Sequence, residues 1–465
     1  MMQIPDLSSY VSPLSWRYGT PRMRKLFSEE YKYRLWRKIW VAIATVQHEA
    51  GLVTKEELAD LKKYEEVIDS KAILAIEEET KHDVVAAIRE FAGRAKVGGK
   101  KIHLGATSMD ITDNADALRV TEALSITKEN VKNLLVAFGK QIQRYADVPC
   151  MGYTHLQPAE PTTVGYRLAM YASDLLTDLE FLGFVVSIYK GKGMKGAVGT
   201  RASYKAVLDG TNITAEKLDS RVMELLGIQG AAIASQVYPR KYDYLVMTVV
   251  ASIASSVSKF ASDVRLLQSP AIGEWSEPFG TKQVGSSAMP FKRNPASSEK
   301  ICSLARYIGQ LPAVALENAS LNHLERTLDD SANRRLILSE GFIALDEILA
   351  SSVKIVEGLV VNTKRIAYNS AQYAPFAATE VLLIALVKKG ADRQKMHELL
   401  REISMQSWEA VQYGKPNPMA NLLETNKIIR MHLSQLEIQK CCDITHHIGD
   451  SPQRAIKLAQ IIKQL

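Results

Sequence analysis

Long runs of helical periodicity constrain the fold of this chain more than any other feature. From Arg240 to Gln268 apolar residues recur every three or four positions, which places one continuous apolar stripe on a long helix. Residues 162–189 repeat the pattern in a nearly heptad rhythm, and residues 112–145 and 333–361 give two more long candidates. Strand-like alternation is almost absent. Because helices of this length bury such stripes in bundles, we predict an all-α fold.

The breaks between these helices hold the candidate chemistry. Four of them are rich in Gly, Pro, Ser or Thr: residues 105–114, 150–161, 190–203 and 275–295. We place domain boundaries near residues 107 and 361. The expected organisation is a helical domain at 1–107, a central long-helix domain at 108–361 that carries the breaks, and a helical domain at 362–465.

Composition narrows the class of protein. With 46% apolar and 23% charged residues, the chain has the composition of a soluble globular protein. The longest uninterrupted apolar stretches fall short of the ~20 residues that cross a bilayer. The first residues, MMQIPDLSSY, lack a signal-peptide pattern, so we expect a cytoplasmic protein without a membrane partner. Its four cysteines show no ligand-like spacing, which indicates neither a disulfide framework nor a zinc site.

The net charge favours a small anionic ligand. A formal charge of +7 spread over 465 residues is dilute, and no block of Lys and Arg with interleaved aromatic residues stands out. Nucleic acid is therefore not expected as a partner.

The segment GSSAMPFKRNP, residues 285–295, combines mobility with charge. Gly285 and the adjacent hydroxyls of Ser286 and Ser287 precede two cations and an asparagine that lie between two prolines. A helix with Asn294 as its cap is predicted to follow, and its N-terminus would favour an anion beside Lys292. The alternative is an ordinary solvated loop, because Gly-Ser-Ser and Lys-Arg are common loop residues.

Two earlier breaks offer further candidates. In GATSMDITDNA, residues 105–115, Thr107 and Ser108 can cap the next helix, with Asp110 and Asp113 favoured by its dipole. In GYTHLQP, residues 152–158, His155 stands between hydrogen-bonding neighbours that could set its tautomer. A lone histidine is more often structural than catalytic, but this position also suits an acid or base.

The remaining candidates concern anions. Residues 190–203 are rich in Gly and Lys and look like a phosphate cradle, but they lack the GxxxxGK[ST] pattern, which argues against a nucleoside triphosphate. Arg326 and Arg335 could make bidentate contacts to an anion, although arginine beside aspartate on a helix is usually a solvated ion pair.

Three segments resemble the signature regions of the fumarase/aspartase superfamily, and they occur in the same order with long helices between them. They are GATSMDITDNA, GYTHLQPAEPTTVGYR and GSSAMPFKRNP. The segments KHDV at 81–84, WRY at 16–18, GAVGT at 196–200, ASQVY at 234–238 and LERTLDDS at 324–331 are similar to the branch that cleaves succinylated purine nucleotides. Lys300 and Arg201 depart from residues common there.

The resemblance implies a reaction and a set of residues. The reaction is β-elimination of fumarate across a C–N bond, from adenylosuccinate and from the succinyl-aminoimidazole carboxamide ribotide of purine synthesis. Ser286 would be the base and His155 the acid, and His82 would orient His155 or hold phosphate or carboxylate. Lys292 and Asn294 would bind the carboxylate on which charge develops. Arg17, Tyr18, Arg326, Ser331 and Arg335 would hold phosphate, while Thr107, Ser108, Thr154, Gln236 and Ser287, together with Asp83, would contact the substrate.

The resemblance also implies an assembly. Superfamily members are homotetramers with a twenty-helix core, each site drawing on three subunits, and they need no cofactor or metal. Two rivals share the same motifs. Argininosuccinate lyase acts on a substrate without phosphate, which the arginine-rich candidates disfavour. The second rival is a structural or binding protein on the same scaffold without catalytic activity. The presence of Ser286, His155 and Lys292 argues against it.

Overall fold

The computed structural model describes residue 6 and residues 8–465 of the chain. The chain divides into two compact units, each built from three separate segments. Unit 1 comprises residues 1–130, 178–255 and 304–348, and unit 2 comprises residues 131–177, 256–303 and 349–465. The three-domain division at 107 and 361 stays a prediction.

The four predicted long helices are confirmed. They are α7 (Ser108–Arg144), α8 (Val164–Ile188), α11 (Lys241–Gln268) and α14 (Asp330–Glu357). The end of α14 is four residues earlier than the stripe indicated, because Gly358 follows the helix and Val360 enters a short strand. Because Val360 and Val361 are apolar, they had been predicted to belong to one more turn of the helix. The predicted all-α class is therefore correct.

Unit 1 surrounds the beginnings of α7 and α14. Its other elements are α1 (Pro13–Trp16), α2 (Pro21–Leu26), α3 (Glu29–Glu49), α4 (Lys55–Tyr64), α5 (Ser70–Thr80), α6 (Asp83–Arg94), η1 (Gly99–Lys101), α9 (Ala202–Leu208), α10 (Ala215–Leu226) and α13 (Leu311–Ser320). A core of large side chains fixes α3 against α6, with Trp36, Trp40 and Phe91 all buried. Each such side chain contributes on the order of 1.5–3 kcal/mol by leaving water.

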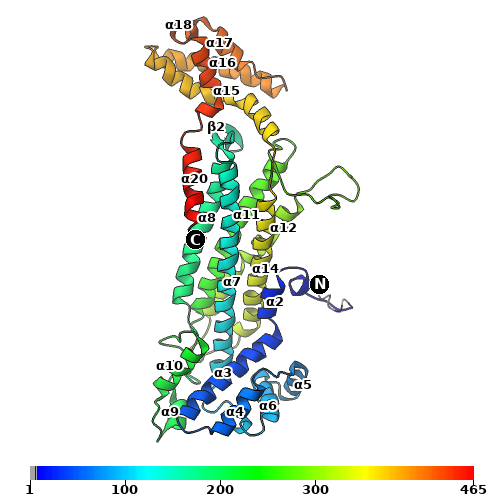
Figure 1. Ribbon diagram of the computed structural model, residues 1–465, viewed down its shortest axis with the longest axis vertical. Helices are drawn as coiled ribbons and strands as arrows, with labels where there is room; N and C mark the ends of the chain where they lie inside the picture. The colour runs from blue at the N-terminus through cyan, green and yellow to red at the C-terminus, as the bar shows by residue number, and fades with distance from the viewer. Residues whose placement is uncertain (1–5, 7) are drawn as a thin grey trace. The chain divides into compact units, whose positions relative to one another are not determined.

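Unit 2 contains the strands β1 to β4 and the C-terminal helices. Its elements are β1 (Pro149–Thr154), β2 (Gln157–Thr163), β3 (Trp275–Ser276), α12 (Ala296–Ile308), β4 (Val360–Val361), α15 (Thr363–Lys388), α16 (Arg393–Gln412), α17 (Met419–Thr425), α18 (Lys427–His432), α19 (Gln435–Cys442), η2 (Ile444–His446) and α20 (Ser451–Ile462). Helices α15 to α18 gather in one group (Figure 1), around a core that includes Leu386, Leu400 and Leu423.

Aromatic rings join three of the long helices inside unit 2. Phe138 of α7 and Tyr171 of α8 both meet the ring of Phe260 of α11 edge-on, with centroids 5.0 and 5.3 Å away. Edge-to-face contacts of this kind add to the stabilisation from burial. Along α11 the middle of the predicted stripe is buried, since the apolar residues Val249, Ile253, Val257, Phe260 and Val264 are each at most 1% exposed.

The break at residues 150–161 differs from its prediction as a loop. It forms an antiparallel hairpin in which β1 pairs with β2, with a bulge between Met151 and Tyr153. The paired segments are rich in Pro and Thr and show no alternation of apolar and polar residues. The pairing therefore left no periodic signal in the sequence.

Two helices, α11 and α15, are long and apolar enough to cross a membrane by length and hydropathy alone. The apolar windows of these helices are 50% and 33% buried inside the protein. The uninterrupted apolar stretches are short, but mean hydropathy over an 18-residue part of each helix reaches 1.5 in α11 and 1.4 in α15. A packed core helix meets the same criteria, so the finding is weak evidence for a span.

Candidate active site

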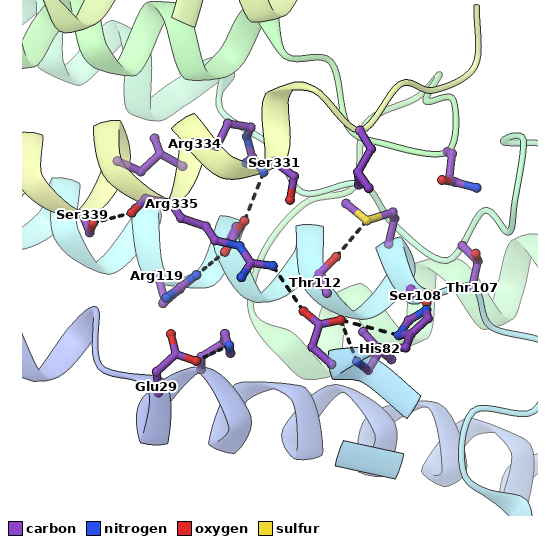
Figure 2. Close-up of a pocket in the computed structure, with 18 of the residues that line it drawn as sticks. Glu29, His82, Thr107, Ser108, Thr112, Arg119, Ser331, Arg334, Arg335 and Ser339 are labelled. Carbon is purple, nitrogen blue, oxygen red and sulfur yellow. Dashed lines mark hydrogen bonds and ion pairs between the residues drawn. The ribbon is translucent and has the colours of Figure 1, made fainter. Parts of the chain in front are cut away.

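A cavity of about 690 Å³ lies in unit 1, and its walls are mostly polar (Figure 2). The walls come from the start of α3, the end of α5, the start of α6, the first half of α7, the segment before α11 and the start of α14. The structure brings together here eight of the residues predicted for the site: His82, Asp83, Thr107, Ser108, Gln236, Arg326, Ser331 and Arg335.

His82 enters the cavity as the cap of α6. Its Nδ1 accepts the backbone N–H of Val85 at 3.4 Å, which satisfies one free amide at the start of the helix. An accepting Nδ1 leaves the ring proton on Nε2 in the neutral form. The ring is half exposed, so Nε2 can serve a ligand. Asp83 follows as the first residue of the helix, and its carboxylate lies 3.3 Å from Nη2 of Arg335.

Asp110 fixes the loop that carries Thr107 and Ser108. Its fully buried carboxylate accepts the N–H of Thr107 at 3.0 Å and the Nζ of Lys192 at 2.6 Å. The hydroxyl of Tyr204 donates to the same carboxylate at 3.1 Å. The prediction that the dipole of α7 explains Asp110 is thus incomplete, because a buried lysine balances most of its charge.

The glycine-rich segment at 190–203 does not form a phosphate cradle at the cavity. Two of its three lysines are buried and form internal ion pairs, Lys192 with Asp110 and Lys195 with Asp219. Arg201, which departs from the family pattern, also binds Asp219 with its Nη2 at 2.6 Å. The segment therefore acts as a structural support behind the wall of the cavity.

Arg326 on the cavity wall has a buried nitrogen without a hydrogen-bond partner among the described residues. This nitrogen is Nη1, whereas Nη2 lies 3.9 Å from Oδ1 of Asp330. The other oxygen of Asp330 already accepts Nε of Arg240 at 2.6 Å. Burial lowers the pKa of Arg326, although arginine stays charged at any physiological pH. An anionic ligand would satisfy this group.

Asp116, Arg119 and Arg334 are among the charged residues of the cavity that sequence reasoning missed. Although burial opposes it, Arg119 and Arg334 hold the pKa of Asp116 below its ordinary value. The spacing could have revealed two of these residues, since positions 108, 112, 116 and 119 share one face of α7. Arg334 neighbours the predicted Arg335, but its guanidinium binds Asp243 at 2.7 Å.

Arg17 and Tyr18 lie outside the described lining of the cavity. Arg17 rests over the ring of Trp16, 4.7 Å from its centroid. Two carboxylates of α14 hold the backbone that follows, because Glu347 accepts the N–H of Gly19 at 3.0 Å and Asp346 accepts that of Thr20 at 2.6 Å. Arg17 and Tyr18 thus lie in unit 1, directly before a backbone segment that α14 holds in place.

His155 occupies the tip of the hairpin in unit 2, next to Thr154. His155 and Leu156 form the two-residue turn with φ of 54° and 59°, values that non-glycine residues seldom adopt. Both side chains are exposed. The predicted hydrogen bonds from neighbours are absent, since no described residue bonds to the ring of His155 in this chain. Strain at an exposed turn is typical of functional sites.

Ser286 lies on the loop of residues 278–294, also in unit 2. Its Oγ accepts the backbone N–H groups of Ala288 at 3.3 Å and Met289 at 3.1 Å. Ser287 and Lys292 are exposed on the same loop. Asn294 does not use its side chain as the predicted helix cap; its Nδ2 donates to the carbonyl of Gly285 at 3.0 Å.

Among residue 6 and residues 8–465 no cluster of His, Cys, Asp or Glu could hold a metal ion. The four cysteines are free thiols.

Comparisons with known proteins place this chain in a family. Residues 17–309 match a family profile described as lyase, and residues 375–456 match one described as adenylosuccinate lyase C-terminus. The chain is 36% identical to adenylosuccinate lyase of Saccharomyces cerevisiae over 463 residues, covering 98% of this chain and 95% of the relative. The chain belongs to the adenylosuccinate lyase family. The enzyme of Archaeoglobus fulgidus, 31% identical, is matched over 98% of this chain and 99% of its own length.

Solved structures support the fold of this family member. The 3-carboxy-cis,cis-muconate lactonizing enzyme of Pseudomonas putida superposes with a TM-score of 0.84 at 23% identity, covering 96% of this chain and 98% of that chain. Fumarate lyase from Mesorhizobium sp. BNC1 gives 0.84 at 20% identity, with 97% and 99% covered. The predicted superfamily fold is confirmed.

Proposed function

We propose that this protein is an adenylosuccinate lyase that eliminates fumarate from adenylosuccinate, giving AMP, and from the succinyl-aminoimidazole carboxamide ribotide. The observation that carries the proposal is Arg326. In a chain of this family, Arg326 lines a cavity of about 690 Å³, and its buried Nη1 has no hydrogen-bond partner among the described residues. A phosphate at that point would satisfy an otherwise costly buried group.

The phosphate end of the substrate would lie at the start of α14. Ser331 and Arg335 line the cavity together with Arg326. The side chain of Arg335 is two-thirds exposed and forms an ion pair with Asp83. Arg17 and Tyr18 complete this set in the proposal. The opposite end, with Thr107, Ser108 and Gln236, would receive the succinyl group. In the proposal, His82 uses its Nε2 at that end of the cavity, where it binds a carboxylate of the substrate or orients His155.

The chemistry requires two proton transfers. A base takes the proton from Cβ of the succinyl group, and the electron pair of that C–H bond forms the double bond of fumarate. The C–N bond breaks, and its electron pair goes to the departing nitrogen, which an acid protonates. We assign the base to Ser286 and the acid to His155, with Lys292 and Asn294 stabilising the negative charge on the carboxylate.

The surroundings of Ser286 support its assignment as the base. A serine hydroxyl must lose its proton before it can accept another. Two backbone N–H groups already point at its Oγ, and hydrogen bonds to a charged form favour that form. Lys292 on the same loop adds a positive charge, and exclusion of water on binding would strengthen both effects.

The site requires other copies of the chain in this proposal. The cavity lining consists of unit 1 residues, whereas Thr154, His155, Ser286, Ser287 and Lys292 belong to unit 2. We propose a homotetramer whose sites are shared between subunits, with the long helices packed at its centre. The free thiols fit a cytoplasmic location.

One assay tests the proposed function. Purified protein is given adenylosuccinate or argininosuccinate, and release of fumarate is followed. We expect fumarate from adenylosuccinate alone. Fumarate from argininosuccinate would reassign the substrate, and fumarate from neither would leave a silent scaffold.

Replacing Arg326 by methionine should weaken binding of the phosphate. We expect KM for adenylosuccinate to rise roughly 10- to 100-fold, because hydrogen bonds to charged groups contribute about 1.5–3 kcal/mol. Since the phosphate lies far from the reacting bond, kcat should change much less. The measurement compares adenylosuccinate with phosphate-free succinyl-adenosine, whose KM should scarcely respond.

Arg401→Met is the matched control, because Arg401 is exposed and binds only Glu398 in its own helix. If Arg326→Met raised KM equally for adenylosuccinate and succinyl-adenosine, Arg326 would not bind the phosphate.

A further inference from the structure

The base of the Ser286 loop, residues 278–294, is closed by a single glutamine. Gln268, the last residue of α11, accepts the backbone N–H of Glu277 with its Oε1 at 3.0 Å. Its Nε2 donates to the backbone carbonyl of Arg293 at 2.9 Å. One side-chain amide therefore holds both the entry and the exit of the loop. No regular secondary structure requires this arrangement, since Glu277 and Arg293 lie outside helices and strands.

Glu277 fastens the entry of the loop to the helix that follows the exit. Its carboxylate accepts the N–H of Ser297 at 3.2 Å and that of Ser298, both in the first turn of α12. A helix N-terminus favours a negative charge, and these amides have no partner within the helix. Glu277 is only 7% exposed, so this capping carboxylate is part of the packed structure.

Two further contacts cross the loop above this base. The side chain of Asn294 donates to Gly285, and the guanidinium of Arg293 lies 5.1 Å from the ring centroid of Phe279. Gly285 comes so close to the opposite arm that a Cβ at this position would lie 2.2 Å from the carbonyl oxygen of Lys292. A side chain is therefore excluded where the arms meet.

The part of the loop beyond these contacts is solvated. Val284 is 79% exposed and Phe291 is 83% exposed, and Figure 1 shows the segment projecting between the end of α11 and the start of α12. Within the tip the Oγ of Ser286 accepts only local hydrogen bonds, from the backbone N–H groups of Ala288 and Met289. The position of Ser286 thus depends on how firmly the base of the loop is held.

We infer that Gln268 and Glu277 are positioning residues for the elimination: they close the base of the Ser286 loop and fix the point from which Ser286 acts. The inference rests on the proposed function, in which Ser286 is the base. Neither residue touches the substrate. Their effect passes through the backbone at 277 and 293, and misplacement of a reacting group by about 1 Å can cost on the order of 10²-fold in rate.

The test uses the full-length protein with Gln268→Leu and, separately, Glu277→Gln. Leucine removes both hydrogen bonds of Gln268 at similar size, and glutamine presents an N–H group to one amide of α12. Ser269→Ala is the matched control, because the hydroxyl of Ser269 donates only to the carbonyl of Leu266 in the preceding turn. Fumarate release gives kcat and KM, and hydrogen exchange follows the amides of Ala288 and Met289.

We expect kcat to fall roughly 10- to 100-fold in both variants, with KM within about threefold of the wild type. Exchange at 288 and 289 should become faster while exchange in the middle of α11 stays unchanged, which loss of overall stability would not produce. The control should match the wild type in both measurements. If Glu277→Gln fails to fold, Gln268→Leu alone decides.

Two results would overturn the inference: faster exchange in the loop with unchanged kcat, or a lower kcat with unchanged exchange. Failure of the proposed function looks different. In that case Ser286→Ala would turn over at the wild-type rate, whereas the exchange measurement would still report whether Gln268 and Glu277 hold the loop.

Discussion

Ser286→Ala should abolish nearly all turnover of adenylosuccinate while leaving its binding almost unchanged. Removal of a general base lowers kcat by roughly 10²–10⁴-fold. The two amides that point at Oγ stabilise the ionised form, so their contribution is made only during proton transfer. An interaction of that kind appears in kcat and not in the dissociation constant.

Two measurements check this expectation. Fumarate release gives kcat, and equilibrium titration with a substrate analogue gives the dissociation constant. Ser269→Ala, a serine at the end of α11 with a purely local hydrogen bond, serves as control. If Ser286→Ala retained rapid turnover, the base would be elsewhere, and the adjacent Ser287 would be tested next.

The sequence predicted the long helices well because their packing is recorded along the chain. Every third or fourth residue of α11 must be apolar to stay buried, from Val246 to Val264, and this requirement leaves a visible stripe. The hairpin of β1 and β2 left no such record. Its strands pair by backbone hydrogen bonds, which any residue except proline can donate, so composition alone could not reveal them.

The candidate site was predictable in part for a related reason. Motif residues such as His82 and Ser331 were found by resemblance, and the structure places both at one cavity. Asp116 and Arg119 were missed although they share one face of α7 with Ser108 and Thr112, because a charged side chain by itself does not distinguish a cavity wall from a solvated face. The segment 190–203 was interpreted as a candidate anion site because of its lysines. Only the fold reveals that Lys192 is paired with the carboxylate of Asp110.

The loop around Ser286 shows the same limit at a shorter range. The sequence correctly indicated a helix after Pro295, but it assigned the cap to Asn294, the nearest suitable residue. The cap is Glu277, many positions earlier, because the loop folds back and brings its two ends together. Capping rules that consider only neighbours in sequence cannot find a partner supplied by chain reversal.

Mixing two inactive variants should restore activity if the sites are shared between subunits. His155→Ala and Ser286→Ala each lack one proton-transfer group, so each alone should be nearly inactive. After joint unfolding and refolding in equal amounts, a site that takes His155 from one chain and Ser286 from another finds both intact in about one case in four, by random assortment in a closed oligomer. Activity should therefore recover to roughly a quarter of the wild-type level.

The physical reason is the division of the groups between the two units. The cavity with its arginines is lined by unit 1, while His155 is exposed on a hairpin tip and Ser286 is half-buried on a projecting loop, both in unit 2. In the proposed tetramer, another copy of the chain supplies the surface that completes such a group. The measurement is fumarate release from mixtures whose mixed oligomers are verified by mass. Activity no higher than the sum of the two separate variants, in mixtures that do contain mixed oligomers, would mean that each site is built within one chain.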